Sequence, residues 1–312
     1  MPAGGAGYTP DMSAATDRAG GGRARLAYRV AGYALVMAAS PLVRVDHDTA
    51  VRKPVDFAVD DAASPLVATA IHAGHDLRAE VAERIALDER ARLREEDPCT
   101  DRIIAPAPAR VVVNRSRFEV DLNRERNDAV YRPSDETWGQ DVWTAPLPED
   151  VVSRSLAVYD DFYDDLAAHL DRLAARGPFV VLDVHSYNHR REGPEAPPAP
   201  AEENPAVNVG TGSLDRKRWA PVVDTLIETL DRTEVRGEPL DVRENVRFEG
   251  ANLALWVHER YPERGCALAL EFKKTFMDEW SGRVDEQHLD DLTAAVASTV
   301  PAVVDAVAGE RR

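Results

Sequence analysis

Continuous apolar runs and segments of helical periodicity alternate along the chain. Three of the runs predict buried strands because they are short and carry little polar interruption: Pro65–Ile71, Phe179–Leu182 and Cys266–Leu270. Ahead of the second run, Val152 to Arg176 repeats apolar residues at three- and four-residue steps, which predicts a long amphipathic helix. A helix followed by a fully apolar strand is typical of an α/β crossover. The pattern therefore predicts an α/β fold.

Further elements are expected between and beyond these runs. Helical periodicity predicts three more helices, Arg78–Glu96, Leu214–Arg232 and Asp285–Val307. Pro301 is expected to kink the last of them. Two short extended segments, Arg110–Val113 and Arg117–Val120, predict strands joined by a tight connection. The proline-rich stretch Glu192–Glu203 predicts a long flexible loop beside a strand end, which makes it a candidate lid.

The first residues of the chain differ in composition from the rest. Residues 1–24 are rich in Gly, Ala, Ser and Thr, and such a composition predicts a disordered tail. Residues 25–312 are predicted to form a single catalytic domain, since layered α/β enzymes often reach this length as one domain. The apolar stretch Val30–Leu42 is short for a membrane span, so we expect no membrane partner. Export by a signal peptide is the minor interpretation.

Charge and cysteine content exclude several classes of function. The 312 residues carry a formal net charge of −17, which should repel the phosphate backbone of nucleic acids. The two cysteines, Cys99 and Cys266, stand far apart and form no metal-type motif, so neither a disulfide framework nor a thiolate zinc site is expected. These features favour a cytoplasmic protein with no nucleic-acid partner, and they leave its oligomeric state open.

Polar residues follow directly after each of the three predicted buried strands. His72, His185 and Glu271 occupy these positions, and in an open α/β sheet ligands gather outside the carboxyl ends of the strands. Two histidines and a carboxylate that converge there can hold a divalent metal, with zinc the best match. Each histidine by itself is more often a buried residue satisfied by backbone groups. Because both stand at strand ends, we favour the metal.

Other charged residues suggest supporting roles. Asp183 precedes His185 by two positions and so projects on the same face of a strand, where it can orient the imidazole; a solvated or helix-capping aspartate is the alternative. Arg115, Arg117 and Arg124 form a cluster that can bind a carboxylate in bidentate fashion. For Arg115, a solvated surface position is the preferred interpretation.

At these residues the chain resembles the N-formylglutamate amidohydrolases, which belong with the zinc carboxypeptidase and aspartoacylase-like hydrolases. The resemblance extends from about Ser64 to Gly282. Its strongest pair of motifs is Asp121-Leu122-Asn123-Arg124 followed by Asp183-Val184-His185-Ser186. The other segments that carry it are Ile71-His72-Ala73-Gly74, Glu96-Asp97-Pro98-Cys99-Thr100-Asp101, Ser116-Arg117-Phe118-Glu119-Val120, Glu249-Gly250-Ala251 and Leu270-Glu271.

The resemblance implies a fold and a metal site. The fold would be a three-layer α/β/α sandwich with a mixed, mostly parallel sheet, the phosphorylase/hydrolase-like architecture of zinc hydrolases. One Zn²⁺ per chain would be held by His72 and His185. A third ligand is expected at Asp97, with His75 and Glu96 as alternatives, because the residue three positions after the first histidine, a glutamate in the carboxypeptidase pattern, is His75 here.

The resemblance also implies a reaction. Glu271 would act as the general base that activates a metal-bound water, and Arg117 would polarise the scissile carbonyl. Asn123 and Arg124 would hold the substrate α-carboxylate. The implied activity is hydrolysis of N-formyl-L-glutamate or a related N-acyl amino acid, a small-molecule substrate. Two alternatives stay open: a zinc carboxypeptidase or peptidase-like deacylase, and a catalytically silent binding protein on the same fold.

Overall fold

The structure is a computed structural model that describes residues 53–132, 137 and 139–310. The tail predicted for residues 1–24 and the apolar stretch Val30–Leu42 lie outside the described residues. The single catalytic domain predicted for residues 25–312 stays a prediction.

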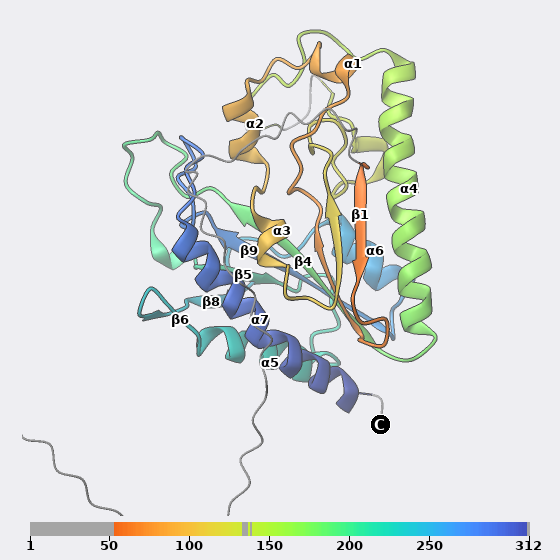
Figure 1. The fold of residues 1–312 in the computed structure, drawn as a ribbon, viewed down its shortest axis with the longest axis vertical. Coiled ribbons are helices and arrows are strands. Elements are labelled where there is room, and N and C mark those ends of the chain that lie inside the picture. The colour runs from red at the N-terminus through yellow and green to blue at the C-terminus, as the bar shows by residue number, and fades with distance from the viewer. Residues whose placement is uncertain (1–52, 133–136, 138, 311–312) are drawn as a thin grey trace, which may run out of the picture. The chain divides into compact units, whose positions relative to one another are not determined.

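A mixed sheet forms the centre of the described structure (Figure 1). Within the described residues it has seven strands in the order β1-β3-β2-β4-β9-β5-β8. In chain order they are β1 (Val55–Val59), β2 (Leu66–Ala70), β3 (Ala109–Val113), β4 (Phe179–Tyr187), β5 (Val207–Gly210), β8 (Val242–Glu244) and β9 (Gly265–Lys273). The four strands β3, β2, β4 and β9 run parallel to one another, whereas β1 and β5 pair antiparallel with β3 and β9, respectively. The predicted mixed, mostly parallel sheet is therefore confirmed.

Helices cover both faces of this sheet. The helices are α1 (Ala79–Ala82), α2 (Glu89–Glu95), α3 (Thr100–Ile103), α4 (Glu149–Ala174), α5 (Ala220–Asp231), α6 (Asn252–Arg260) and α7 (Glu286–Gly309). One hydrophobic core joins the sheet to α3, α5 and α7, and a second joins its other face to α4 and α6. In Figure 1, α5 and α7 lie side by side, as their contacts require. The three-layer α/β/α arrangement is confirmed.

Strand alternation decides which side chains face which layer. In β4, Val180, Leu182 and Val184 belong to the core with α5 and α7, and Phe179 and Val181 to the core with α4 and α6. Because successive side chains alternate between faces, Asp183 and His185 point to the α4 side. The last part of β4 extends beyond the apolar core, so Asp183 and His185 lie where polar side chains can contact one another.

Two of the predicted elements differ in the structure. The single helix expected over Arg78–Glu96 is two short helices, because Ile85 forms a β-bridge with Trp143 and Asp88 caps α2 by accepting from the Ala91 N–H. The strand expected over Arg117–Val120 is wrong as well: Glu119 and Val120 donate backbone hydrogen bonds to Ser116, which closes a turn. In both places local hydrogen bonds override the apolar pattern.

Several elements had no clear pattern in the sequence. The strands β1, β5 and β8 and the helix α6 were not predicted, nor were the minor strands β6 (Glu234–Val235) and β7 (Glu238–Pro239) and the 3-10 turns η1 (Arg126–Asp128) and η2 (Ala201–Glu203). The stretch Glu192–Glu203 is irregular apart from η2, as expected. The predicted helix over Leu214–Arg232 begins later, at Ala220, where Pro221 occupies the first turn.

The last helix, α7, is long and apolar enough to span a membrane by length and composition. Many of its apolar side chains instead pack inside the protein. Leu289, Leu292, Val296, Val303 and Val307 are buried in the core with the sheet and α5. The apolar composition of α7 is therefore explained by packing, and the helix continues through Pro301.

Candidate active site

The carboxyl ends of β2, β4 and β9 bring polar residues together at one edge of the sheet. His72 follows β2, while His185 and Glu271 lie in the last third of β4 and β9. The two strands are parallel neighbours, and His185 pairs in register with Glu271. The three residues singled out at strand ends therefore converge, as the sequence predicted from parallel topology.

A buried cluster with the geometry of a metal site lies at this edge. His72, Asp97 and His185 each offer one ligand atom, and these atoms lie within 4.8 Å of one another. Asp97 Oδ2 is 3.0 Å from His185 Nδ1 and 3.4 Å from His72 Nδ1. The His72 Nδ1 atom is buried and has no hydrogen-bond partner in the described part of the chain. A buried nitrogen lone pair that faces a carboxylate and a second imidazole fits a divalent cation.

Each of the two imidazoles is held from behind by a buried carboxylate. His72 Nε2 donates to Asp121 Oδ1 at 2.7 Å, and His185 Nε2 donates to Asp183 Oδ2 at 3.0 Å. These hydrogen bonds place the protons on Nε2 and leave both Nδ1 atoms turned toward Asp97. Carboxylate support of this kind fixes the tautomer and raises the basicity of a metal-binding histidine. Asp183 thus lies where a supporting role requires it, and Thr69 Oγ1 orients it by donating to Oδ1 at 2.6 Å.

The loop that carries Asp97 is fixed on several sides. The Asp97 N–H donates to the His72 carbonyl at 2.9 Å, and Ser186 Oγ donates to Asp97 Oδ1 at 3.2 Å. Lys274, only 1% exposed, donates from Nζ to the Glu96 carbonyl at 2.6 Å. Since Oδ1 is occupied by Ser186, Oδ2 is the oxygen left to face the two histidines.

The surroundings of Asp97 and Asp121 favour the ionised form of both carboxylates. Burial by itself would raise the pKa of Asp97, but the adjacent His185 and His72 imidazoles hold that pKa far below its usual range. Burial likewise opposes ionisation of Asp121, yet the Arg117 charge and His72 keep its pKa well below the ordinary value. Burial would lower the pKa of His185, but the Asp183 carboxylate holds it well above its usual range. Both carboxylates are ionised at neutral pH, as a cation site requires.

Glu271 stands apart from these ionised carboxylates. Burial raises its pKa from 4.5 to about 7, and the negative charges of Asp97 and Asp183 add to this effect. Within the described residues its carboxylate takes part in no hydrogen bond or ion pair. A carboxylate with a pKa near neutrality that shares a pocket with His72, Asp97 and His185 has the properties of a general base.

These residues line a pocket of about 170 Å³. Its wall contains His72, Asp97, His185 and Glu271, together with Glu95, Arg117, Asn123, Ser186, Tyr187, Asn188, Arg191, Phe248 and Lys274. The volume suits a small polar molecule, and the wall supplies both cationic donors and carboxylate acceptors.

The two alternative third ligands, His75 and Glu96, lie outside the cluster and pair with each other. His75 Nδ1 is 2.5 Å from Glu96 Oε2, and Arg92 Nη2 lies 2.8 Å from His75 Nε2. Ser116 donates to the other Glu96 oxygen. Both side chains are therefore engaged in joining the segment between β2 and α1 to the end of α2.

The three residues predicted to contact substrate, Arg117, Asn123 and Arg124, do not all line the same pocket. Arg117 lines the pocket, and its Nη2 donates to Asp121 Oδ2 at 2.7 Å. Asn123 also lines it and accepts from the Leu253 N–H at the start of α6 at 3.0 Å. Arg124 instead stacks over the Tyr131 ring at 4.4 Å and lines a neighbouring pocket. Arg115 is buried beside Glu119 and does not line the pocket, contrary to the expectation of a solvated surface position.

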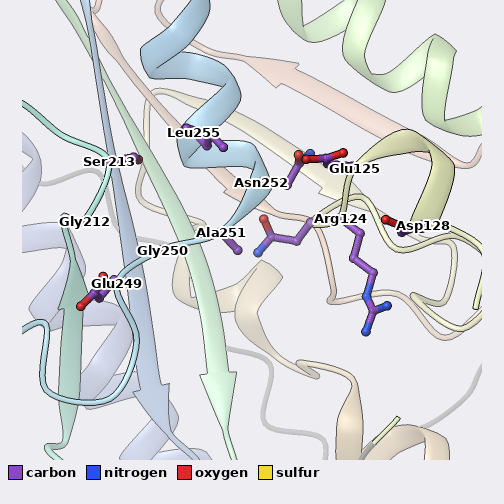
Figure 2. A pocket seen from close by; sticks show the side chains of 11 residues that line it. Arg124, Glu125, Asp128, Gly212, Ser213, Glu249, Gly250, Ala251, Asn252 and Leu255 are labelled. Atoms are coloured by element: carbon purple, nitrogen blue, oxygen red, sulfur yellow. The ribbon is translucent and has the colours of Figure 1, made fainter. Parts of the chain in front are cut away.

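The neighbouring pocket is larger, at about 520 Å³, and the two pockets share Asn123 in their walls. Figure 2 shows Arg124, Glu125 and Asp128 on one side of it, with Gly212 and Glu249 on the other. It offers space beside the smaller pocket for parts of a ligand that the smaller pocket does not hold.

Sequence reasoning missed several residues of the site. Asp121 was noted only as part of a motif, although it contacts His72, Arg117 and Tyr131. Arg191 and Lys274 were not singled out either. Their positions just past the ends of β4 and β9, as cations in a strongly acidic chain, were the available signal.

Comparisons with known proteins agree with this architecture. The model of the family described as N-formylglutamate amidohydrolase matches residues 64–277, more than half of the chain. The crystal structure of an N-formylglutamate amidohydrolase from Ralstonia eutropha JMP134 has a TM-score of 0.65 at 17% identity, with 82% of this chain and 99% of that chain covered. The crystal structure of a gene product from Agrobacterium tumefaciens has a TM-score of 0.60 at 15% identity and covers 83% and 96%. No curated protein matches the chain.

Proposed function

The chain belongs to the N-formylglutamate amidohydrolase family, hydrolases that act on amide bonds, and on that basis we propose that it hydrolyses N-formyl-L-glutamate or a related N-acyl amino acid with the help of one bound Zn²⁺. The observation that carries the proposal is the buried cluster of His72, Asp97 and His185 beside Glu271. The cytoplasm is the proposed location.

In this proposal His72 Nδ1, Asp97 Oδ2 and His185 Nδ1 hold the zinc. Two imidazoles and one carboxylate are a usual ligand set for catalytic zinc, and a set of three leaves a coordination position open. When bound, the ion supplies Lewis acidity, which acidifies water and polarises a carbonyl group. Asp121 and Asp183 support the site by holding the Nε2 side of each histidine.

Glu271 is the proposed general base. With a pKa near 7 its carboxylate takes the proton from the attacking water, and the same group then passes that proton to the leaving amine. One residue thus serves both halves of the reaction, since the amide nitrogen must be protonated before the C–N bond breaks.

The charges of the pocket fit an anionic substrate. Arg117, Arg191 and Lys274 supply cationic donors in the pocket wall, and Asp97, Asp121 and Asp183 would balance a bound dication. Arg117, fixed by Asp121, would polarise the scissile carbonyl. Asn123 and Arg124, at the boundary with the larger pocket, would hold the α-carboxylate.

The test combines metal analysis of the purified protein with a formate-release assay. Its substrates are N-formyl and N-acetyl derivatives of glutamate, aspartate and glutamine, beside short peptides. We expect about one zinc per chain, formate release from N-formylglutamate, and loss of turnover after chelation with recovery on zinc addition. An undiminished rate in fully metal-depleted protein contradicts the mechanism. Cleavage of peptides alone would indicate a carboxypeptidase, and neither zinc nor hydrolysis would indicate a silent binding protein.

A further inference from the structure

The pocket beside the metal cluster is lined, among the described residues, by three cationic side chains that differ in how far they are already engaged: Arg117, Arg191 and Lys274. Arg117 donates from Nε and Nη2 to Asp121 and from Nη1 to the Glu95 carbonyl. Lys274 is 1% exposed and donates to the carbonyls of Arg94 and Glu96 at 2.6 Å each. Most of the donors of both side chains are therefore already engaged within the protein.

Arg191 is held differently. Its side chain is 38% exposed, and its ion pair is with Glu95, at 3.1 Å from Nη2 and 3.4 Å from Nη1. A guanidinium carries five N–H donors, so these two long contacts leave donors available. It extends from the segment that follows β4, just past the end of the strand that carries His185.

The surroundings of Arg191 remain cationic despite Glu95. The Glu95 carboxylate is 5% exposed and is shared between Arg191 and Arg94, whose Nε lies 3.4 Å from Oε1. Lys274 donates to the Arg94 carbonyl in the same place. The Glu95 carboxylate is thus shared between two guanidinium groups and does not by itself neutralise Arg191, in a chain of net charge −17.

An N-acyl acidic amino acid has two carboxylates, and the function proposed above assigns the α-carboxylate to Asn123 and Arg124. The second one requires another cation in the pocket. Resting on that proposed function, we propose that Arg191 is the specificity-determining residue that binds the side-chain carboxylate of the substrate. An exposed guanidinium fork matches a carboxylate in bidentate geometry, which a neutral carboxamide does not. The enzyme then selects acidic side chains over their isosteric amides.

The experiment compares kcat/KM for three substrates of nearly equal size in the zinc-loaded full chain. N-formylglutamine lacks the side-chain charge, and N-formylisoglutamine lacks the α-carboxylate. We expect wild type to prefer N-formylglutamate over N-formylglutamine, and Arg191→Gln to reduce that preference by roughly 10- to 100-fold. The preference over N-formylisoglutamine should persist. Because each ratio is taken within one protein sample, partial unfolding of a variant does not alter it.

Arg247→Gln is the matched control. Arg247 is exposed and stacks over Tyr187 and Phe248, two residues of the pocket wall, but does not itself line the pocket. The Arg247→Gln substitution removes a positive charge near the pocket and should leave the ratio of kcat/KM for N-formylglutamate to that for N-formylglutamine unchanged. An unchanged ratio in Arg191→Gln, an equal loss in Arg247→Gln, or a loss confined to the isoglutamine comparison each overturns the assignment. If wild type releases formate from none of the substrates, the proposed function itself is refuted, and this inference with it.

Discussion

His185 and Glu271 lie directly opposite each other on the parallel strands β4 and β9. Cross-strand partners in register project on the same face of a sheet, so the proposed metal ligand and the proposed general base are held together by the rigid centre of the fold. A site built on central strands keeps its geometry more precisely than one built on loops.

The first prediction concerns Glu271→Gln. The amide keeps the shape of the side chain but cannot accept the proton from water, so kcat/KM for N-formylglutamate should fall by about 10² to 10⁴. Zinc content, measured on the same sample, should stay at the wild-type level because Glu271 is not among the ligands. Glu259→Gln, an exposed glutamate on α6, is the control and should retain full activity. Loss of metal in Glu271→Gln would show that the residue is a ligand instead.

The second prediction is a pH profile. Burial raises the pKa of Glu271 to about 7, and a bound dication would lower it by charge attraction. A base works only when deprotonated, so kcat/KM should fall as the pH drops through a pKa at or below 7. The measurement is kcat/KM from pH 4 to 9, with folding followed by circular dichroism over the same range. An activity independent of pH between 4 and 7 in folded protein would contradict the role.

The third prediction tests Asp121, which holds both His72 and Arg117. Asp121→Asn should weaken zinc binding by roughly 10- to 100-fold, because the imidazole loses its carboxylate partner. It should also destabilise the fold by about 3 kcal/mol, since the mostly buried Arg117 loses its counter-ion. Chelator competition and urea unfolding measure the two effects.

The control for Asp121 is an exposed ion pair of the same type. Asp160 accepts from Arg126 in bidentate fashion, but both side chains are nearly half exposed. Asp160→Asn should therefore cost less than about 1 kcal/mol and leave zinc affinity unchanged. Equal effects of the two substitutions would mean that Asp121 has no special connection to the metal site.

The fourth prediction concerns His258 and stability. The Ala267 N–H donates to its Nε2 at 2.9 Å, and burial lowers its pKa from 6.5 to about 4. Between these values the unfolded chain binds a proton that the folded chain does not, so stability is lost as the pH falls from 6.5 to 4 and is unaffected above. The loss amounts to about 3 kcal/mol. Urea unfolding across this range should show a shallower acid slope for His258→Gln, and identical slopes would contradict the assignment.

The fifth prediction concerns Gly74, two residues after His72. A Cβ built there would lie 2.2 Å from the backbone carbonyl of Asn114, which cannot rotate away. Gly74→Ala should destabilise the protein by about 2 kcal/mol or more and weaken zinc binding by displacing His72. Gly309→Ala, with nothing within 4 Å of its Cβ, should be close to neutral. Thermal unfolding and zinc titration of both variants decide the question.

The local pattern of apolar residues predicted some helices and strands of this fold and not others. Continuous apolar runs predict strands buried on both faces, and these became β2, β4 and β9. Apolar residues at three- and four-residue steps predict helices buried on one face, and these became α4 and α7. The same reasoning joined Arg78–Glu96 into one helix, because it does not register the bridge between Ile85 and Trp143. Short strands such as β5 have too few residues to establish a period.

The sequence by itself determined which chemical groups stand at the ends of the central strands, since a polar residue that follows a buried run is visible in the order of residues. It also supplied Asp97 as one of several possible third ligands. Only the tertiary structure brought Asp97 to the two histidines and engaged His75 with Glu96. Asp121 and Asp183 acquired their distinct partners in the same way. These contacts join residues far apart in the chain, and their geometry is set by packing of the layers, which local periodicity does not encode.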